Sequence, residues 1–236
     1  MMNPVVQPIR SLKRLARVAA GRDVWQTRQL STATLTLGGT KASWTICDST
    51  LPPASTVYSL GVGEDISFDL ELIKRFGVTV HAFDPTPRTI EWISTQTIPA
   101  GFVFHPFGVG AVDGVCRFLP PRNPGHVSHS VIHRDTPWPS IELPVHRLGT
   151  ILRMLGHERI DLLKMDIEGA EYGVIRDLLD AEIRVGQLLV EFHHRWREVG
   201  IELTQKTIRD LNEAGYRIFH VSARGDEYSF LNVRSQ

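Results

Sequence analysis

The sequence is poor in cysteine and carries no excess charge of either sign, and both shortages exclude classes of protein. Cys47 and Cys116 are the only cysteines, too few and too far apart for a disulfide framework or a Cys/His zinc module. The 26 basic and 26 acidic residues balance, so no broad field marks the chain as a nucleic-acid binder. The partner is therefore expected to be recognised locally, as a small molecule is.

Long apolar runs are also missing. No run approaches the length of a membrane span, and the first residues are basic but lack the apolar segment of a secretory signal. The apolar share of 42% in 236 residues suffices for one substantial core without a disulfide or a structural metal. We therefore expect a soluble, cytoplasmic protein, and the sequence carries no signal for its oligomeric state.

Residues 1–55 are predicted to form an N-terminal extension. Between Val5 and Ala19 apolar residues recur at helical spacing opposite a basic face, the pattern of a short amphipathic helix. We interpret this helix as docked on the core, while a membrane-surface anchor and an Arg-rich targeting segment stay open as alternatives. The stretch from Ser31 to Cys47, with two glycines at its centre, predicts a β-hairpin.

From residue 56 to residue 236, extended apolar segments alternate with helical patterns, which is typical of parallel strands joined by crossover helices. We predict a doubly wound, mostly parallel seven-stranded sheet, an α/β fold of the Rossmann-like kind, with a C-terminal antiparallel hairpin. The predicted strands are 57–60, 78–83, 102–109, 160–165, 187–192, 216–221 and 227–233, and the predicted helices are 68–76, 89–95, 170–179 and 205–214.

The stretch from Pro120 to Pro139 contains five prolines and three histidines and cannot form a regular element, because proline lacks a backbone donor. We predict a loop over the site. A metal centre at its histidines is not favoured, since a flexible segment offers no fixed tetrahedron of ligands. The histidines are His126, His129 and His133.

In an open α/β sheet, ligands bind beyond the carboxyl ends of the strands. The first predicted strand runs into Ser59-Leu60-Gly61-Val62-Gly63, where glycines let a ligand approach the backbone. The second ends at Asp84, followed by Pro85 and 21 positions after Gly63, near the ~20-residue spacing of an acid that accepts hydrogen bonds from ribose. The alternative is a surface aspartate at a helix start, but the glycines upstream favour a nucleoside site.

Position 66 decides between nucleosides. A dinucleotide fingerprint has its third glycine there, and this chain has Ile66, which disfavours a pyrophosphate. An adenosine without phosphates fits better and indicates S-adenosylmethionine (SAM). The strongest motif follows the strand 160–165, where Asp166 stands at the strand tip. Glu168 and Glu171 also suit a helix N-terminus through its dipole, so Asp166 is the functional candidate.

The run Lys164-Met165-Asp166-Ile167-Glu168-Gly169-Ala170-Glu171 resembles the K-x-D-x-E-G-x-E signature of the FkbM-type SAM-dependent methyltransferases. The runs 57–63 and 67–85, and Gly38-Gly39 with Trp44 and Cys47, are similar to a methyltransferase-like branch of that group. The resemblance covers roughly residues 37–233. It implies a class I methyltransferase fold with SAM lying across Ser59, Gly61, Val62, Gly63, Asp84, Pro85, Gly108, Val109 and Asp166.

This chain departs from the commoner methyltransferase motif, with Ser59 in place of an acid and Asp65 in place of a third glycine. The departure leaves the contacts of the methionine end of SAM open. The resemblance further implies methylation of a hydroxyl on a sugar, glycan or natural product. Two alternatives stay open, namely a non-catalytic SAM-binding module and a nicotinamide-dependent oxidoreductase, the second disfavoured by Ile66.

The strand 187–192 ends in Glu191-Phe192-His193-His194. Alternation places Glu191 and His193 on one side and His194 on the other. We predict His193 as general base, with Asp166 orienting the acceptor or the cofactor. A variant of this hypothesis gathers Asp166, Glu191 and His193 around a divalent metal ion that binds the acceptor oxygens.

Overall fold

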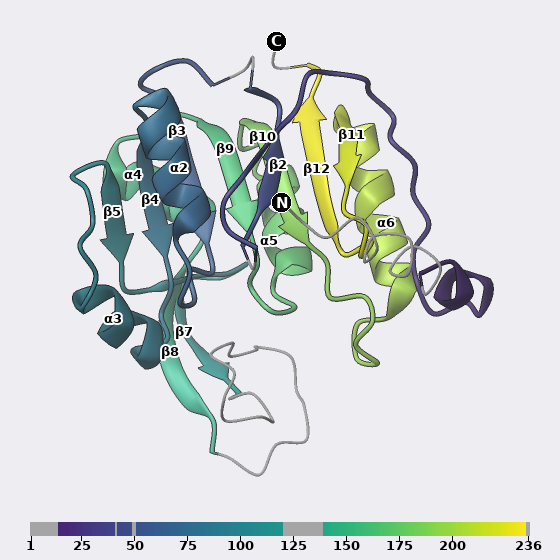
Figure 1. The fold of residues 1–236 in the computed structure, drawn as a ribbon. Coiled ribbons are helices and arrows are strands. Elements are labelled where there is room, and N and C mark those ends of the chain that lie inside the picture. Colours follow the sequence, from purple (N-terminus) through teal and green to yellow (C-terminus); the bar gives the residue numbers. More distant parts are fainter. Residues whose placement is uncertain (1–13, 41, 49–50, 120–138, 235–236) are drawn as a thin grey trace.

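The computed structural model describes residues 14–40, 42–48, 51–119 and 139–234. Its centre is a seven-stranded sheet in the order β11-β12-β10-β9-β3-β4-β5 (Figure 1). Only β12 runs antiparallel to its neighbours in this sheet. The predicted doubly wound seven-stranded sheet is confirmed. Its strands are β3 (Thr56–Leu60), β4 (Thr79–Phe83), β5 (Phe102–His105), β9 (Ile160–Met165), β10 (Val185–Glu191), β11 (Tyr216–Val221) and β12 (Glu227–Asn232).

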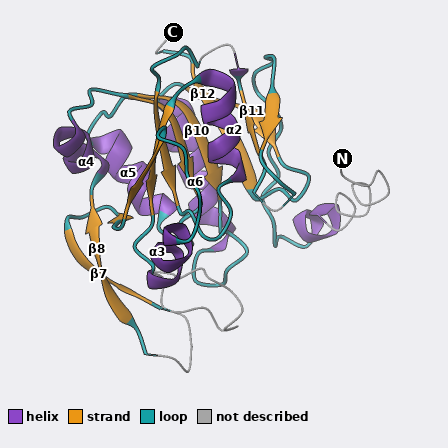
Figure 2. Ribbon diagram, turned by 60° about the vertical axis from the view of Figure 1, so that its left-hand side comes forward, coloured by secondary structure: helices purple, strands orange, loops and turns teal. Residues whose placement is uncertain are grey.

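Helices cover both faces of the sheet, and each face has its own apolar core (Figures 1 and 2). One core contains residues of α4 (Leu148–Leu155), α5 (Glu171–Asp180) and α6 (Gly200–Glu213), and the other contains residues of α2 (Ser67–Phe76). Because successive side chains of a strand point to opposite faces, Val57 joins one core and Tyr58 the other. The central strands are therefore apolar on both faces, as parallel strands usually are.

Local sequence signals set the ends of two helices near the site. The helix α2 ends at Gly77, whose φ of +66° is left-handed and whose N–H bonds to Ile73, the usual glycine stop. The helix α3 (Pro87–Ser94) begins with proline, whose missing N–H costs nothing in the first turn. Both helices thus begin in the short segments that follow β3 and β4, where the candidate residues lie.

The predicted strand 102–109 is wrong as a single strand. Pro106 cannot donate to a sheet ladder, and the chain divides there into β5 and β6 (Gly108–Val109). The strand β6 belongs to a second sheet of order β6-β8-β7, which projects from the main body (Figure 2). Its other strands, β7 (Gly114–Phe118) and β8 (Ile141–His146), and the helix α4 were not predicted from the sequence, and α6 begins earlier than expected.

The N-terminal residues reach the sheet through a hairpin. The strands β1 (Leu35–Leu37) and β2 (Trp44–Ile46) pair antiparallel, as predicted, and their apolar residues join the core over α2. Residues 14–19 are helical, but most of the helix predicted between Val5 and Ala19 lies outside the described residues. The division of the chain after residue 55 stays a prediction. In the described ranges no helix combines the length and the apolar character that crossing a membrane requires.

Candidate active site

A cavity of about 490 Å³ opens at the carboxyl ends of β3, β4 and β9. The residues predicted to contact the cofactor all line it except Ser59, namely Gly61, Val62, Gly63, Asp84, Pro85, Gly108, Val109 and Asp166. Glu191 lines it too. Ser59 is fully buried and pairs in register with Lys164 of β9. Its side chain is buried within β3, two residues before Gly61, the first residue of this segment that lines the cavity.

The turn after β3 is closed against the turn after β9. Gly61 has φ +78°, and a Cβ at this position would lie 1.8 Å from the backbone oxygen of Asp166, so only glycine fits. The N–H of Asp166 donates to the oxygen of Leu60 at 3.0 Å. The buried ammonium of Lys164 donates to the oxygens of Leu60 and Gly61. These contacts fix the glycine turn at the cavity wall.

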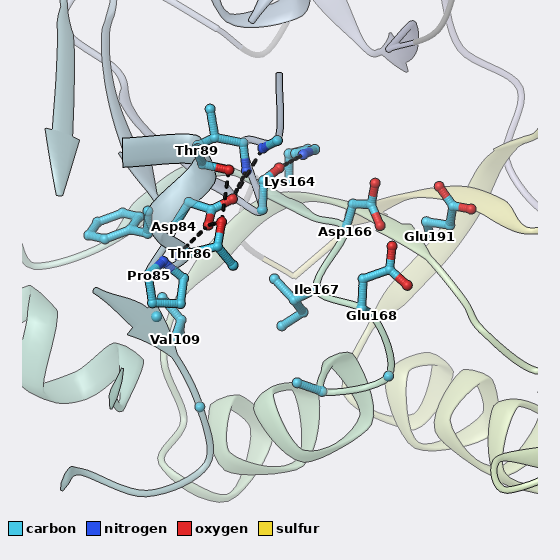
Figure 3. Close-up of a pocket in the computed structure, with 18 of the residues that line it drawn as sticks. Asp84, Pro85, Thr86, Thr89, Val109, Lys164, Asp166, Ile167, Glu168 and Glu191 are labelled. Carbon is cyan, nitrogen blue, oxygen red and sulfur yellow. Dashed lines mark hydrogen bonds between the residues drawn. The ribbon is translucent and has the colours of Figure 1, made fainter. Parts of the chain in front are cut away.

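Asp84 holds the same turn from the other side. Its Oδ2 accepts hydrogen bonds from the amides of Val62 at 3.0 Å and Gly63 at 3.1 Å, and its Oδ1 accepts from the amide and hydroxyl of Thr86 (Figure 3). A carboxylate offers about four lone-pair sites, and all four have protein donors here. The predicted hydrogen bonds from ribose hydroxyls to Asp84 therefore require the ligand to share or replace one of these donors.

Ile66 occupies the position of the third glycine. It is buried with Val62, Ala82, Ile93 and Phe102. Its side chain packs in this cluster next to the start of α2 and is not among the residues that line the cavity.

The turn after β9 forms an acidic group with the end of β10. The fully buried Glu171 accepts a hydrogen bond from the amide of Gly169 at 2.8 Å, and its Oε1 lies 3.1 Å from both the amide nitrogen and Nδ1 of His193. Nε2 of His193 faces two further carboxylates, 3.5 Å from Glu168 and 3.9 Å from Asp166. The candidate residues Asp166 and His193 are thus neighbours, and Glu168 joins them.

The sequence model of the methyltransferase FkbM domain matches residues 52–218. The chain belongs to the FkbM methyltransferase family. The resemblance of the motif at residues 164–171 to that family is thereby confirmed, and this motif builds the acidic turn beside the cavity.

Two curated relatives of this FkbM family member are named "Probable methyltransferase-like protein 24", one from Rattus norvegicus and one from Homo sapiens. Each is 26% identical over 175 residues, which is 70% of this chain and 42% of the relative. The chain therefore spans less than half the length of these relatives. A solved FkbM methyltransferase from Methylobacillus flagellatus KT overlays with a TM-score of 0.46 and 16% identity, covering 75% of this chain and 43% of that one. Aeropyrum pernix fibrillarin with natively bound S-adenosyl-L-methionine overlays with a TM-score of 0.43 and 11% identity. This overlay covers 78% of this chain and 68% of the fibrillarin chain.

The charges of the FkbM acidic group control its protonation. Burial by itself lowers the pKa of His193, but the hydrogen bond and the charge of Glu171, with the charges of Asp166 and Glu168, raise it to about 9. Burial and the charge of Asp166 raise the pKa of Glu191 to about 8. The imidazole is therefore expected to hold its proton at neutral pH. The predicted role of His193 as general base requires that proton to leave first.

The neighbouring histidine has a different environment. Nε2 of His194 lies 2.8 Å from Asp23, which also accepts hydrogen bonds from Arg195, and burial lowers the pKa of His194. His193 thus contacts Glu171 of α5, whereas His194 contacts Asp23 and connects the N-terminal segment to the end of β10. The loop residues His126, His129 and His133 lie outside the described residues.

Several cavity residues were missed by the sequence reasoning. The sequence explains Glu168 as an acid that suits a helix N-terminus, yet Glu168 lines the cavity. Its position in the motif at residues 164–171 was the signal that could have identified it. Trp44 enters from the hairpin, and its ring lies 5.6 Å from the ammonium of Lys164. Cys116 and Val145 also line the cavity and come from β7 and β8. Neither strand was predicted from the sequence, so no signal pointed to these residues.

Proposed function

We propose that this FkbM domain transfers the methyl group of SAM to a hydroxyl of a sugar, a glycan or a natural product. The observation that supports the proposal best is that a single cavity is lined by both the glycine turn and the carboxylates of Asp166, Glu168 and Glu191. Figure 3 shows Asp84 and Thr86 at one end and Asp166, Glu168 and Glu191 at the other. A methyl donor at one end and a hydroxyl acceptor at the other can therefore meet in this cavity.

The glycine end suits the cofactor. Left-handed glycines at positions 61 and 63 let the adenosine and the methionyl chain approach the backbone, and the apolar Val109 and Pro85 border the same region (Figure 3). Ile66 argues against a nicotinamide dinucleotide, because the dinucleotide fingerprint has glycine at this position for close packing of the helix on the strand. SAM carries no pyrophosphate and does not need this fingerprint.

The acidic end suits a hydroxyl acceptor. Carboxylates accept hydrogen bonds from hydroxyl groups and so orient the acceptor oxygen, and Asp166 and Glu191 both border the cavity. The sulfonium of SAM is an activated donor, so most of the catalysis is alignment of oxygen, methyl carbon and sulfur at reacting distances of ~3 Å. The acceptor oxygen forms the new bond to carbon, the carbon–sulfur electrons stay on sulfur, and the hydroxyl proton leaves to a carboxylate or to water.

Calorimetry of the full chain tests the cofactor half of this proposal. We expect S-adenosylhomocysteine and SAM to bind, and NADH to bind at least ~10-fold more weakly, which is about 1.4 kcal/mol. Tighter binding of NADH would favour the oxidoreductase, and heat from none of the three would refute the cofactor assignment.

The transfer half is tested with a panel of methyl glycosides as acceptors, by measuring release of S-adenosylhomocysteine from SAM. We expect turnover with at least one glycoside and a much slower rate for Asp166→Asn. Cofactor binding without turnover on any hydroxylated acceptor would favour the non-catalytic binding module instead.

A further inference from the structure

We propose that Asp166, Glu168 and His193 form a binding site for one divalent cation at the acceptor end of the cavity. Within the described ranges, these three residues bring one ligand atom each to within 4.8 Å of one another. Glu168 thus replaces Glu191 in the metal hypothesis drawn from the sequence. The role of the ion rests on the transferase function proposed above, whereas its binding does not.

The spacing of the ligand atoms suits a small cation. Nε2 of His193 lies 3.5 Å from Oε2 of Glu168 and 3.9 Å from Oδ1 of Asp166. An ion with ligands at ~2.1 Å in octahedral geometry holds adjacent ligand atoms about 3.0 Å apart and opposite ones about 4.2 Å apart. These two separations fall between those values, and the ligand atoms of Asp166 and Glu168 lie within 4.8 Å of each other, so side-chain adjustments can bring all three onto one ion.

The imidazole is oriented as metal-binding histidines usually are. Its side chain is 8% exposed, and Nδ1 faces Glu171, which is fully buried and is itself held by the amide of Gly169. A ligating histidine typically gives its other N–H to a carboxylate in this way, which fixes the ring and its tautomer. With Nδ1 occupied by Glu171, Nε2 is the nitrogen aimed at Asp166 and Glu168.

The backbone at Glu168 is consistent with this arrangement. Its φ is +52°, an uncommon left-handed conformation for a residue other than glycine, and such residues concentrate at functional sites. Figure 3 shows the carboxylates of Asp166 and Glu168 on the same side of the turn as Glu191. The strained backbone therefore keeps a third negative charge beside Asp166 and Glu171, an arrangement that a cation stabilises.

The ligand types indicate the ion and its use. Two carboxylates and one imidazole suit Mn²⁺ or Mg²⁺ better than a soft metal, and three protein ligands leave positions open for an acceptor oxygen. A cation there lowers the pKa of the acceptor hydroxyl, whose proton passes to water as the oxygen takes the methyl carbon from sulfur. A protonated His193 without any metal is the competing explanation for the same cluster.

The test uses the full chain after treatment with EDTA. Titration with MnCl₂, followed by the electron paramagnetic resonance of free Mn²⁺, is expected to give one bound ion per chain. Pulsed electron paramagnetic resonance of the bound Mn²⁺ is expected to detect coupling to one imidazole nitrogen. Glu168→Gln is expected to weaken Mn²⁺ binding by at least ~10–100-fold, the loss that removal of even an outer partner of a metal site causes.

Glu182→Gln is the matched control, because Glu182 is exposed and also has a left-handed φ of +51°. This variant is expected to bind Mn²⁺ like the wild type. Absence of bound Mn²⁺ or of nitrogen coupling in the folded wild type would overturn the proposal, as would an equal loss in both variants. S-adenosylhomocysteine calorimetry on the EDTA-treated chain separates the two proposals, since cofactor binding without Mn²⁺ binding refutes the metal site alone.

Discussion

Replacement of Gly61 by alanine tests the closure of the two turns most directly. Alanine at φ +78° costs roughly 1–2 kcal/mol of backbone strain. The new Cβ would lie 1.8 Å from the oxygen of Asp166, whereas real Cβ contacts stay above 3.0 Å, so the turns must separate by about 1.2 Å (3.0 minus 1.8). Overpacking of this kind costs roughly 1–3 kcal/mol more. We expect Gly61→Ala to lose about 2–5 kcal/mol of unfolding free energy.

Gly77→Ala is the control for the strain alone. Gly77 has φ +66°, but nothing lies within 4 Å of its Cβ position, so its expected loss is only about 1–2 kcal/mol. Urea unfolding followed by circular dichroism gives both free energies, and calorimetry with S-adenosylhomocysteine gives the affinities. We expect Gly61→Ala alone to lose at least ~10-fold in affinity. Equal losses of stability and of affinity in the two variants would refute the reasoning.

Three other perturbations probe the surroundings. Asp84→Asn puts an NH₂ group opposite buried donors, so we expect urea unfolding to show a loss of about 1.5–3 kcal/mol; an unchanged midpoint would contradict this. Burial and two neighbouring histidines lower the pKa of His81 from 6.5 to about 4, so the unfolded chain binds more protons between these values. Stability is then complete above pH 6.5 and falls towards pH 4 by about 1 kcal/mol after allowance for partial exposure; His81→Gln should flatten this melting-temperature profile. Asp23→Asn leaves His194 and Arg195 short of a buried partner, so we expect about 3 kcal/mol less stability and faster proteolysis before residue 30 at unchanged S-adenosylhomocysteine affinity.

The central sheet was predictable because each of its strands is a short apolar run that can be recognised from a few consecutive residues. The strands β3, β4 and β9 are short apolar runs that end in glycine or in an acid, and their carboxyl ends must meet at one edge of a parallel sheet. This geometry predicts that residues 61, 84 and 166 lie close together, and all three line the same cavity. Strand spacing therefore predicts which residues are neighbours.

The second sheet was not predictable for equally local reasons. Pro144 stands within β8 and pairs with Val115, and a proline within a run argues against a strand. The strand β7 is largely exposed, so it lacks the alternation of a half-buried strand. The role of Glu171 was hidden as well, because its partner His193 is 22 positions away and reaches it only through the pairing of β10 with β9. Contacts of this kind depend on tertiary structure and leave no local pattern.

Asp166 links the two ends of the cavity through one residue. Its N–H donates to Leu60 and its backbone oxygen lies against Gly61, while its carboxylate faces His193 at 3.9 Å. The glycine turn thus positions the backbone of Asp166, and the carboxylate can differ in position only by rotation of its own side chain. A methyl transfer depends on alignment of donor and acceptor to fractions of an ångström. Because the same residue contacts the glycine turn and His193, a shift of the glycine turn is expected to move the carboxylate of Asp166 with it.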